Sequence, residues 1–572
     1  MLKYLKKYRA QCVLAPLFKM LEAMFDLLVP LVVASIIDAG ILRGDAGHIW
    51  RMVGVLVALG LVGLAAAVTA QYFAAKAATG FAADVRHALF TRLTGLSFPD
   101  VDRLGTAAMI TRMTSDVNQA QTGVNMALRL LLRSPFVVLG AMVMAFTIDA
   151  RCALIFLAVI AALGLVVGGS MAVNIPMTAR VQRQLEVVLA ATRENLTGAR
   201  VLQAFRRQDA QLQAFRMKNR ELTALQRRAG RVSALLNPAT CVLINAAVIV
   251  LVRQGALRVN AGALSTGAVV ALYNYMSQIL VELIKFASLV ITINKALVSW
   301  KRIEGALALE PSIQSPDTLT VPLEAGAPAV TFRHVGLTYP GAGSAAQEDI
   351  DFSALPGQTV GIIGGTGSGK SSVAGLIPRF YEATAGEVLV NGVNVRDWPR
   401  DALRERVGVV MQKASLFKGT IRENLLWGRA DATDDALLAA ARTAQAEDVL
   451  AAKGGLDGEL TQNGGNLSGG QRQRLTIARA LVRRPEILIL DDSASALDMA
   501  TDARLRRAIA ALDYRPTVFV ISQRAASVMG ADLILVLDDG RVAGKGTHAQ
   551  LMESCPIYRE IYESQFGRGA AV

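Results

Sequence analysis

The chain has 572 residues, 53% of them hydrophobic, a mean hydropathy of +0.39 and a net charge of +14 at pH 7. This length exceeds one ordinary core, and the hydropathy excludes a purely soluble protein. The positive charge is compatible with a nucleic-acid partner. However, the basic residues of the first half lie between apolar runs of nearly the ~20 residues that cross a bilayer, a pattern typical of membrane proteins. We therefore expect a membrane protein and no nucleic-acid partner.

Six apolar stretches predict membrane helices. They lie at about residues 11–40, 50–80, 128–148, 152–174, 234–254 and 266–293. The connections after the second and fourth helices are long and rich in arginine, which places them and both chain ends in the cytoplasm. Apolar residues recur there at helical spacing, so the membrane helices should continue beyond the bilayer. Breaks at 98–105 and 194–198 are compatible with short transverse helices or with ordinary helix-loop-helix punctuation.

The composition changes after the last apolar stretch. Residues 310–328 are rich in Pro, Ser, Thr and Asp without a clear period, which indicates a linker. From about residue 329, alternating strand and helix patterns indicate an α/β domain. We therefore predict an all-α membrane domain at 1–309, the linker, and a nucleotide-binding domain at 329–572. The four cysteines are far apart, with no C-x-x-C spacing, and indicate neither a metal site nor a disulfide framework.

A glycine-rich loop carries the clearest chemistry. It matches G-x-x-x-x-G-K-[ST] at Gly364-Gly365-Thr366-Gly367-Ser368-Gly369-Lys370-Ser371. Only glycine lets the main-chain N–H groups approach phosphates so closely, Lys370 adds positive charge, and the Ser371 hydroxyl is suited to ligate Mg2+. A strand-like run before the loop and a helix-like run after it favour ATP binding over a chance glycine turn.

A second motif follows the apolar run 487–490, which ends in Asp491 and Asp492. Ligands bind at the carboxyl ends of parallel strands. Asp491 is therefore suited to hold Mg2+, and Asp492 stands where a base for the attacking water is needed. Two adjacent acids can also be a solvated turn, but the upstream phosphate loop favours the functional interpretation.

A third motif, Leu467-Ser468-Gly469-Gly470-Gln471, lies between these two. With it the chain resembles ATP-binding cassette (ABC) exporters that fuse six membrane helices to one nucleotide-binding domain, and the resemblance covers nearly the whole chain. In that family two domains meet head to tail, and each ATP lies between one domain's phosphate loop and the other's LSGGQ, so the resemblance implies a dimer.

The same resemblance implies individual roles. Tyr339 would stack on adenine, and Gln412 would reach Mg2+ and link to the membrane domain. The loop at 495–498, with Asp498, would cross between the two ATP sites, and segments 98–105 and 194–198 correspond to the family's coupling helices. Expected ATP contacts are Tyr339, Gly364, Thr366, Gly367, Ser368, Gly369, Lys370, Ser371, Ser372, Ser468, Gly469, Gly470, Gln471 and Asp498, with Ser371, Gln412 and Asp491 at the metal and Asp492, Gln523 and Gln412 in catalysis.

Two residues depart from the family pattern. Asp492 replaces the catalytic glutamate, and its carboxylate falls short of the water by on the order of 1 Å, which can cost ~10²-fold in rate. Gln523 replaces the histidine that contacts the γ-phosphate, and a neutral amide carries no charge. The intact LSGGQ would complete a partner's site, so we expect a heterodimer like the bacterial multidrug exporters with one degenerate ATP site. A homodimer with two impaired sites is the alternative.

Charges within membrane helices are expensive and indicate function. Glu22, Asp26 and Glu282 are the candidates for attracting a cationic substrate, whereas Lys19 and Lys285 stand at i, i+3 from two of them and could simply neutralise them. The expected substrate is a hydrophobic or amphipathic compound exported across a bacterial plasma (inner) membrane. A homodimeric lipid flippase or a lipid or peptide exporter stays the alternative, and a membrane-anchored soluble-type ATPase is disfavoured by the six spans.

Overall fold

The computed structural model describes residues 1–319, 321–322, 324 and 326–567. By internal contacts the chain forms two units, Met1–Thr94 with Ala107–Leu309, and Gly95–Thr106 with Glu310–Val572. The short segment Gly95–Thr106 therefore groups with the second unit. Of the predicted linker at 310–328, residues 320, 323 and 325 lie outside the described part.

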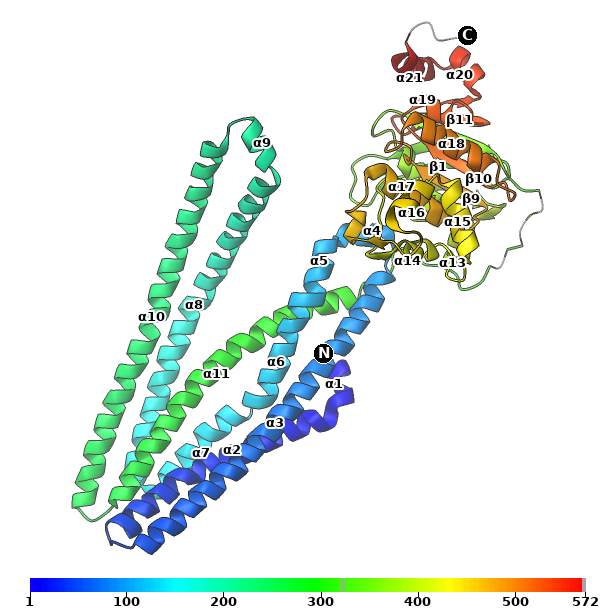
Figure 1. Ribbon diagram of the computed structural model, residues 1–572. Coiled ribbons are helices and arrows are strands. Elements are labelled where there is room, and N and C mark those ends of the chain that lie inside the picture. Colours follow the sequence, from blue (N-terminus) through cyan, green and yellow to red (C-terminus); the bar gives the residue numbers. More distant parts are fainter. Residues whose placement is uncertain (320, 323, 325, 568–572) are drawn as a thin grey trace. The chain divides into compact units, whose positions relative to one another are not determined.

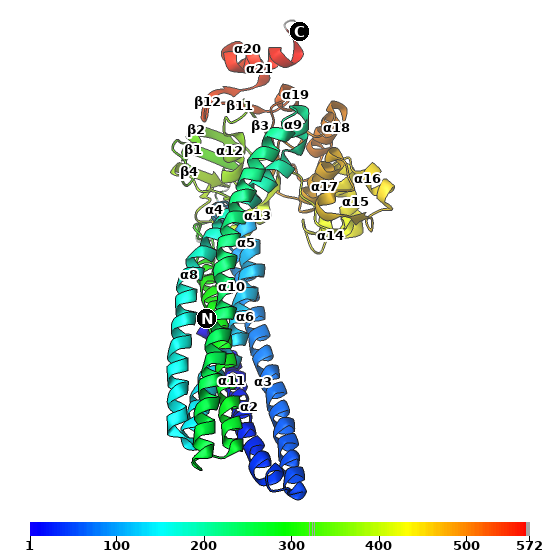
Figure 2. The same cartoon turned by 90° about the vertical axis from the view of Figure 1, so that its left-hand side faces the viewer.

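The first unit is built of helices (Figure 1), and six helical stretches are long and apolar enough to cross a membrane, as the sequence predicts. Its helices are α1 (Leu2–Leu5), α2 (Arg9–Ser35), α3 (Ala46–Thr94), α5 (Thr106–Thr111), α6 (Val117–Leu130), α7 (Arg133–Ile148), α8 (Ala150–Thr197), α9 (Ala199–Ala204), α10 (Gln208–Asn260) and α11 (Thr266–Leu307), with 3-10 turns at Lys6–Tyr8 and π-helical turns at Ile36–Ile41 and Arg112–Asp116. Figure 2 shows α8 and α10 running side by side, joined at one end by α9.

Two boundaries differ from the sequence prediction. The predicted span 128–148 is interrupted between α6 and α7, because Pro135 has no N–H to donate to the carbonyl of Leu131. The transverse helix predicted at 194–198 is wrong: Gly198 N–H donates to Glu194 O, so these residues form the last turn of α8, and the short helix is α9. The break at 98–105 does hold a short helix, α4 (Phe98–Leu104).

Over its described residues, the second unit contains three β-sheets, of which the smallest pairs β7 with β8. A six-stranded sheet has the order β12-β11-β3-β10-β9-β6, parallel except for β12, and a four-stranded antiparallel sheet has the order β2-β1-β4-β5. The strands are β1 (Val330–Leu337), β2 (Gln347–Ala354), β3 (Thr359–Gly364), β4 (Ala385–Val390), β5 (Val393–Asn394), β6 (Val407–Val410), β7 (Gly419–Thr420), β8 (Glu459–Leu460), β9 (Ile487–Asp491), β10 (Thr517–Ile521), β11 (Leu533–Asp538) and β12 (Arg541–Gly546).

Helices cover these sheets (Figure 1). Besides α4 they are α12 (Lys370–Leu376), α13 (Arg400–Arg406), α14 (Ile421–Leu426), α15 (Asp434–Thr443), α16 (Glu447–Lys453), α17 (Gly469–Val482), α18 (Met499–Ala510), α19 (Ala525–Val528), α20 (His548–Ser554) and α21 (Pro556–Phe566), with a 3-10 turn at Gln462–Gly464.

The parallel sheet is buried on both faces, which explains why Ile487–Leu490 of β9 and Val518–Ile521 of β10 are apolar. On β10, Phe519 and Ile521 join a core with the antiparallel sheet and α12, whereas Val518 and Val520 join a core with α14 to α21. Since β3, β9 and β10 are parallel, the loops that follow them emerge at one edge of the sheet. That edge carries the sequence-predicted motifs.

Candidate nucleotide site

The glycine-rich loop connects β3 to α12 and is shaped by glycine. Gly367 and Gly369 have φ of +86°, a conformation that L side chains rarely adopt. A Cβ on Gly369 would lie 1.8 Å from Nε2 of Gln347, so the loop could not close over that buried side chain. Gln347 Nε2 donates to Gly369 O at 2.8 Å. The sequence analysis missed Gln347, because nothing local marks a residue 22 positions away as a support for the loop.

Lys370 is held against its own loop. Its Nζ donates to Gly364 O at 3.0 Å and to Gly365 O at 2.5 Å. Burial lowers the pKa of Lys370, although the nearby Asp492 and Asp491 act in the opposite direction. The ammonium group therefore lies at the base of the loop, where phosphate oxygens would gain most from a desolvated charge.

Ser371 and Asp491 meet at the end of β9. Ser371 Oγ donates to Asp491 Oδ1 at 2.9 Å, and burial, followed by the charge of Asp492, raises the pKa of Asp491. Hydroxyl and carboxylate oxygens are the ligands that Mg2+ prefers, and a desolvated carboxylate gains from a bound cation. The donor set therefore fits the metal predicted from the sequence.

One cavity of about 350 Å3 brings the phosphate-loop set together. Its lining includes Tyr339, Ala346, Thr366, Gly367, Gly369, Lys370, Ser371, Ser372, Gln412, Asp491, Asp492, Ile521 and Gln523. Tyr339 and Ser372 are joined by a hydrogen bond of 2.8 Å between their hydroxyls. Gly364 and Ser368 belong to the same loop but are not among the lining residues.

Asp492 is fixed by its main chain. Its N–H donates to Ile521 O at 2.9 Å, its φ is +45°, and its Oδ2 accepts a hydrogen bond from Gln412 Nε2 at 3.3 Å. The two departures from the family pattern, Asp492 and Gln523, thus line the same cavity as Lys370.

The LSGGQ motif begins a helix at a different place. Ser468 is the N-cap of α17, and it forms a capping box with Gln471, each side chain bonded to the other's backbone N–H. A cavity of about 740 Å3 is lined there by Ser468, Gly470, Gln471, Asp498 and other residues. A Cβ on Gly470 would lie 2.9 Å from Ala496 O, so glycine lets the motif, which includes Gly469, lie against the loop at 495–498. Within this chain the motif and the phosphate loop line separate cavities.

Helix α4, which belongs to the second unit, packs within it near the predicted adenine residue Tyr339. Phe98 stacks on Phe380 with ring centroids 4.2 Å apart, and Tyr381 OH donates to Asp102 Oδ2 at 2.7 Å. The rings of Tyr381 and Tyr339 form an edge-to-face contact, with their centroids 5.0 Å apart. Burial, followed by the hydrogen bond to Asp102, raises the pKa of Tyr381. The sequence analysis missed Asp102 and Tyr381, which are 279 positions apart.

The first unit holds a separate charged network. Arg133, on α7, lies 3.8 Å from a Glu22 oxygen, 3.0 Å from an Asp26 oxygen and 2.5 Å from a Glu282 oxygen. Glu22 also pairs with Lys19, and Glu282 with Lys285. The structure thus brings together the three predicted substrate residues, with three cations for three carboxylates. Arg133 was missed, although it stands within the predicted span 128–148 and could have been found by listing every charge there.

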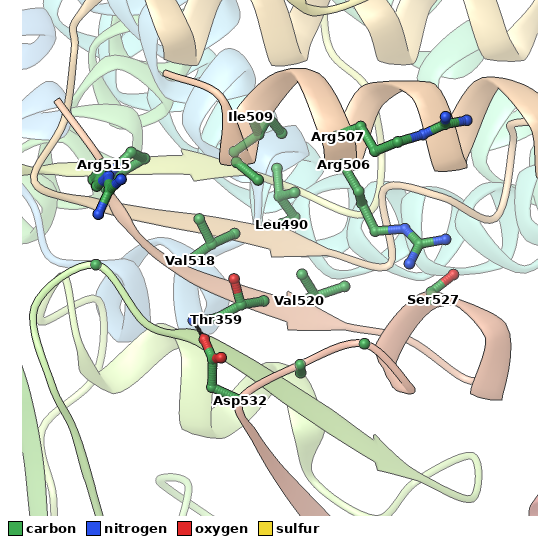
Figure 3. Close-up of a pocket in the computed structure, with 15 residues that line it drawn as sticks. Thr359, Leu490, Arg506, Arg507, Ile509, Arg515, Val518, Val520, Ser527 and Asp532 are labelled. Atoms are coloured by element: carbon green, nitrogen blue, oxygen red, sulfur yellow. Dashed lines mark hydrogen bonds between the residues drawn. The ribbon is translucent and has the colours of Figure 1, made fainter. Parts of the chain in front are cut away.

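A further cavity of about 430 Å3 lies elsewhere on the second unit. Figure 3 shows Leu490, Val518 and Val520 on its sheet side and Arg506 and Arg507 on the α18 side. It contains none of the sequence-predicted site residues.

Six membrane-spanning helices followed by an α/β unit with these motifs define an exporter of the ATP-binding cassette class. Residues 12–283 match the family model of the ABC transporter transmembrane region, and residues 347–495 match that of the ABC transporter. The chain is 35% identical over 568 residues to the uncharacterized ABC transporter ATP-binding protein YfiB of Bacillus subtilis, which covers 99% of this chain and 98% of that protein. The chain therefore belongs to the ABC transporter family.

Two more comparisons extend this result. The ATP-dependent lipid A-core flippase of Chromobacterium violaceum is 29% identical over 580 residues, covering 100% of this chain and 97% of that protein. The solved structure of a bacterial Atm1-family ABC exporter with ATP bound has a TM-score of 0.81 at 23% identity, covering 98% of this chain and 99% of that chain. The predicted fold class is thereby confirmed, and the chain is a multi-pass membrane protein with an ATP-binding domain.

Proposed function

We propose that this chain is one subunit of a heterodimeric ATP-driven exporter, and that its own ATP site binds nucleotide but hydrolyses it slowly. The observation that carries the proposal is the composition of the cavity at Lys370. Five residues of the phosphate loop line it, Thr366, Gly367, Gly369, Lys370 and Ser371, yet Asp492 and Gln523 occupy the positions expected to be catalytic. The proposal also places the protein in a bacterial inner membrane, with its nucleotide domain in the cytoplasm.

In this proposal the chain's own residues divide the work at the site. Tyr339 stacks on adenine, and Lys370 and the main chain of the phosphate loop neutralise the phosphates. Ser371, Gln412 and Asp491 would hold Mg2+, which would supply charge neutralisation for the phosphates. Asp492 is too short by on the order of 1 Å to activate water well, which slows turnover by ~10²-fold.

The intact LSGGQ motif supports a partner subunit that differs from this chain. Ser468 and Gly470 line a cavity that contains no residue of this chain's phosphate loop, so a second nucleotide domain is needed to place ATP against them. If that domain carries the missing glutamate and histidine, hydrolysis at the partner's phosphate loop drives the cycle. A homodimer would contain two impaired sites and no competent one.

The transported compound is proposed to be hydrophobic or amphipathic. The network around Arg133 is charge-balanced, so it gives little net attraction for a cation, and pairing between helices accounts for Glu22, Asp26 and Glu282 more simply than cation binding does. The similarity to proteins named lipid A-core flippases favours a second candidate, a homodimeric lipid flippase.

The test compares ATP hydrolysis by the purified chain in nanodiscs with that of the Asp492→Glu, Gln523→His double variant. The wild-type chain alone should turn over slowly, and the double variant should gain up to ~10²-fold if geometry at this site is limiting. Lys370→Ala in both backgrounds is the matched control and should abolish the signal. Robust hydrolysis by the lone wild-type chain would refute the degenerate site and favour the homodimeric pump. No gain in the double variant would show that these two residues do not limit the reaction.

A further inference from the structure

The C-terminal helix α21 contacts the loop that carries Gln523. Gln565, near the end of this helix, accepts a hydrogen bond from Ala525 N–H through Oε1 and donates one to Gln523 O through Nε2, both at 2.8 Å. A single amide therefore bridges the two sides of residues 523–525. Ala525 is the first residue of α19, and the first N–H groups of a helix have no partner within it. Gln565 supplies the missing acceptor.

Arg524, between these two residues, binds the neighbouring loop. Its guanidinium donates to the carbonyls of Ala494 at 3.2 Å, Ser495 at 3.1 Å and Leu497 at 3.0 Å. These carbonyls belong to the loop that runs from Asp492 to Asp498. Residues 523–525 are thus fixed on one side by α21 and on the other by this loop.

Helix α21 is itself firmly attached to the second unit. Tyr558 is fully buried, and its hydroxyl is 2.8 Å from His548 Nδ1. Tyr562 is also buried, packs against His548, and contacts Phe566 with ring centroids 4.7 Å apart. Because Tyr558 and Tyr562 fix α21 in place, Gln565 extends from a rigid helix end, which is the arrangement needed to hold another segment in place.

We propose that Gln565 is a positioning residue that holds the loop at 523–525 and, through Arg524, the loop at 494–498. The first loop carries Gln523 into the cavity at Lys370, and the second contributes Leu497 and Asp498 to the cavity at Ser468. The C-terminal helix would thereby influence both nucleotide-facing surfaces of the domain. The amide group of Gln565 serves both contacts because it carries a donor and an acceptor. The inference rests on ATP binding at these surfaces but not on a heterodimer.

Hydrogen exchange of the full chain in nanodiscs tests whether Gln565 holds residues 523–525 in place. In Gln565→Leu, the amide of Ala525 should exchange about fivefold faster, the effect expected for losing one partly exposed hydrogen bond, while the amides of β10 stay unchanged. In Gln565→Glu, the carboxylate still accepts from Ala525 but cannot donate to Gln523, so Ala525 should keep its protection. Ser564→Ala, at the neighbouring exposed position, is the matched control.

Measurements of ATP binding and ATP turnover distinguish a positioning role of Gln565 from a purely structural one. Gln565→Leu should leave the Kd for ATP unchanged, because Tyr339 and Lys370 are untouched, and should change the turnover of the assembled transporter. Unchanged exchange at Ala525 in Gln565→Leu would overturn the proposal. If the amides of Tyr558 and Tyr562 also lose protection in Gln565→Leu, the whole of α21 has detached, and the Gln565→Glu variant then decides. Wild-type exchange at Ala525 in Gln565→Glu supports the proposal, and fast exchange there overturns it. Fast hydrolysis by the lone chain would refute the degenerate site without changing these results.

Discussion

Replacing Arg133 by methionine should strongly destabilise the membrane unit. The guanidinium is only 10% exposed and contacts Glu22 and Asp26 from α2 and Glu282 from α11. Methionine fills a similar length without charge, so three carboxylates would face only the ammonium groups of Lys19 and Lys285. Glu282, whose side chain is only 5% exposed, would lose its arginine partner, and one negative charge of the network would remain uncompensated.

The magnitude follows from this uncompensated charge. Removing one partner of a buried ion pair costs about 3–5 kcal/mol, and 1 kcal/mol shifts the Tm of a unit of ~150–250 residues by about 2–4 °C. The unit in question is larger than this, so about 2 °C per kcal/mol applies and a decrease in Tm of roughly 6–10 °C is expected for Arg133→Met. Thermal unfolding of the purified chain in nanodiscs, followed by intrinsic fluorescence, measures it.

Two companion variants make the experiment decisive. Arg86→Met is the matched control, because Arg86 binds the neutral side chain of Asn118, and it should cost about 1 kcal/mol. Adding Glu282→Gln to Arg133→Met restores two cations for two carboxylates and should recover part of the loss. If Arg133→Met melts with the control, or if the double variant melts below the single one, the network does not stabilise the unit as argued.

Two further predictions concern the second unit. Tyr381→Phe keeps the ring beside Tyr339 but removes the hydrogen bond to Asp102. Because hydrogen bonds to charged groups contribute about 1.5–3 kcal/mol, the amides of α4 should exchange about tenfold faster, while the Kd for ATP stays unchanged. A changed Kd would mean that the Tyr381 hydroxyl acts in the nucleotide site instead. Burial raises the pKa of Asp491, so its carboxylate takes up a proton at a higher pH than an ordinary Asp at ~3.9. Because Mg2+ binds the deprotonated form, Mg2+-dependent ATP binding should weaken as the pH falls through that raised pKa, and Asp491→Asn should remove this component; a wild-type profile that stays flat down to about pH 4 would contradict the prediction.

Features set by local sequence are the ones that a sequence can predict. The phosphate loop depends on glycine conformations within eight residues, and the six spans depend on apolar length, so both can be recognised without a structure. The errors lie at helix ends: Gly198 ends α8 rather than a transverse helix, and Pro135 interrupts a span.

Contacts between distant residues could not be predicted. Arg133 and Glu282 are 149 positions apart, Tyr381 and Asp102 are 279 apart, and Gln565 and Gln523 are 42 apart. Each pair meets only because elements far apart in the sequence pack together, and no local pattern marks the partners. The sequence gives the residue types that can form such pairs, whereas packing determines which of them meet.

The contacts around the ATP site explain how the slow hydrolysis proposed for it would be compatible with a working transporter. Gln523 is held through its carbonyl, Asp492 through its N–H, and Arg524 reaches three carbonyls. Main-chain atoms do not change when a side chain is replaced. A glutamate-to-aspartate or histidine-to-glutamine change therefore removes catalytic groups while leaving the links between the loops intact. Such a site can still bind ATP and transmit binding to its neighbours, which is what the proposed heterodimer requires of it.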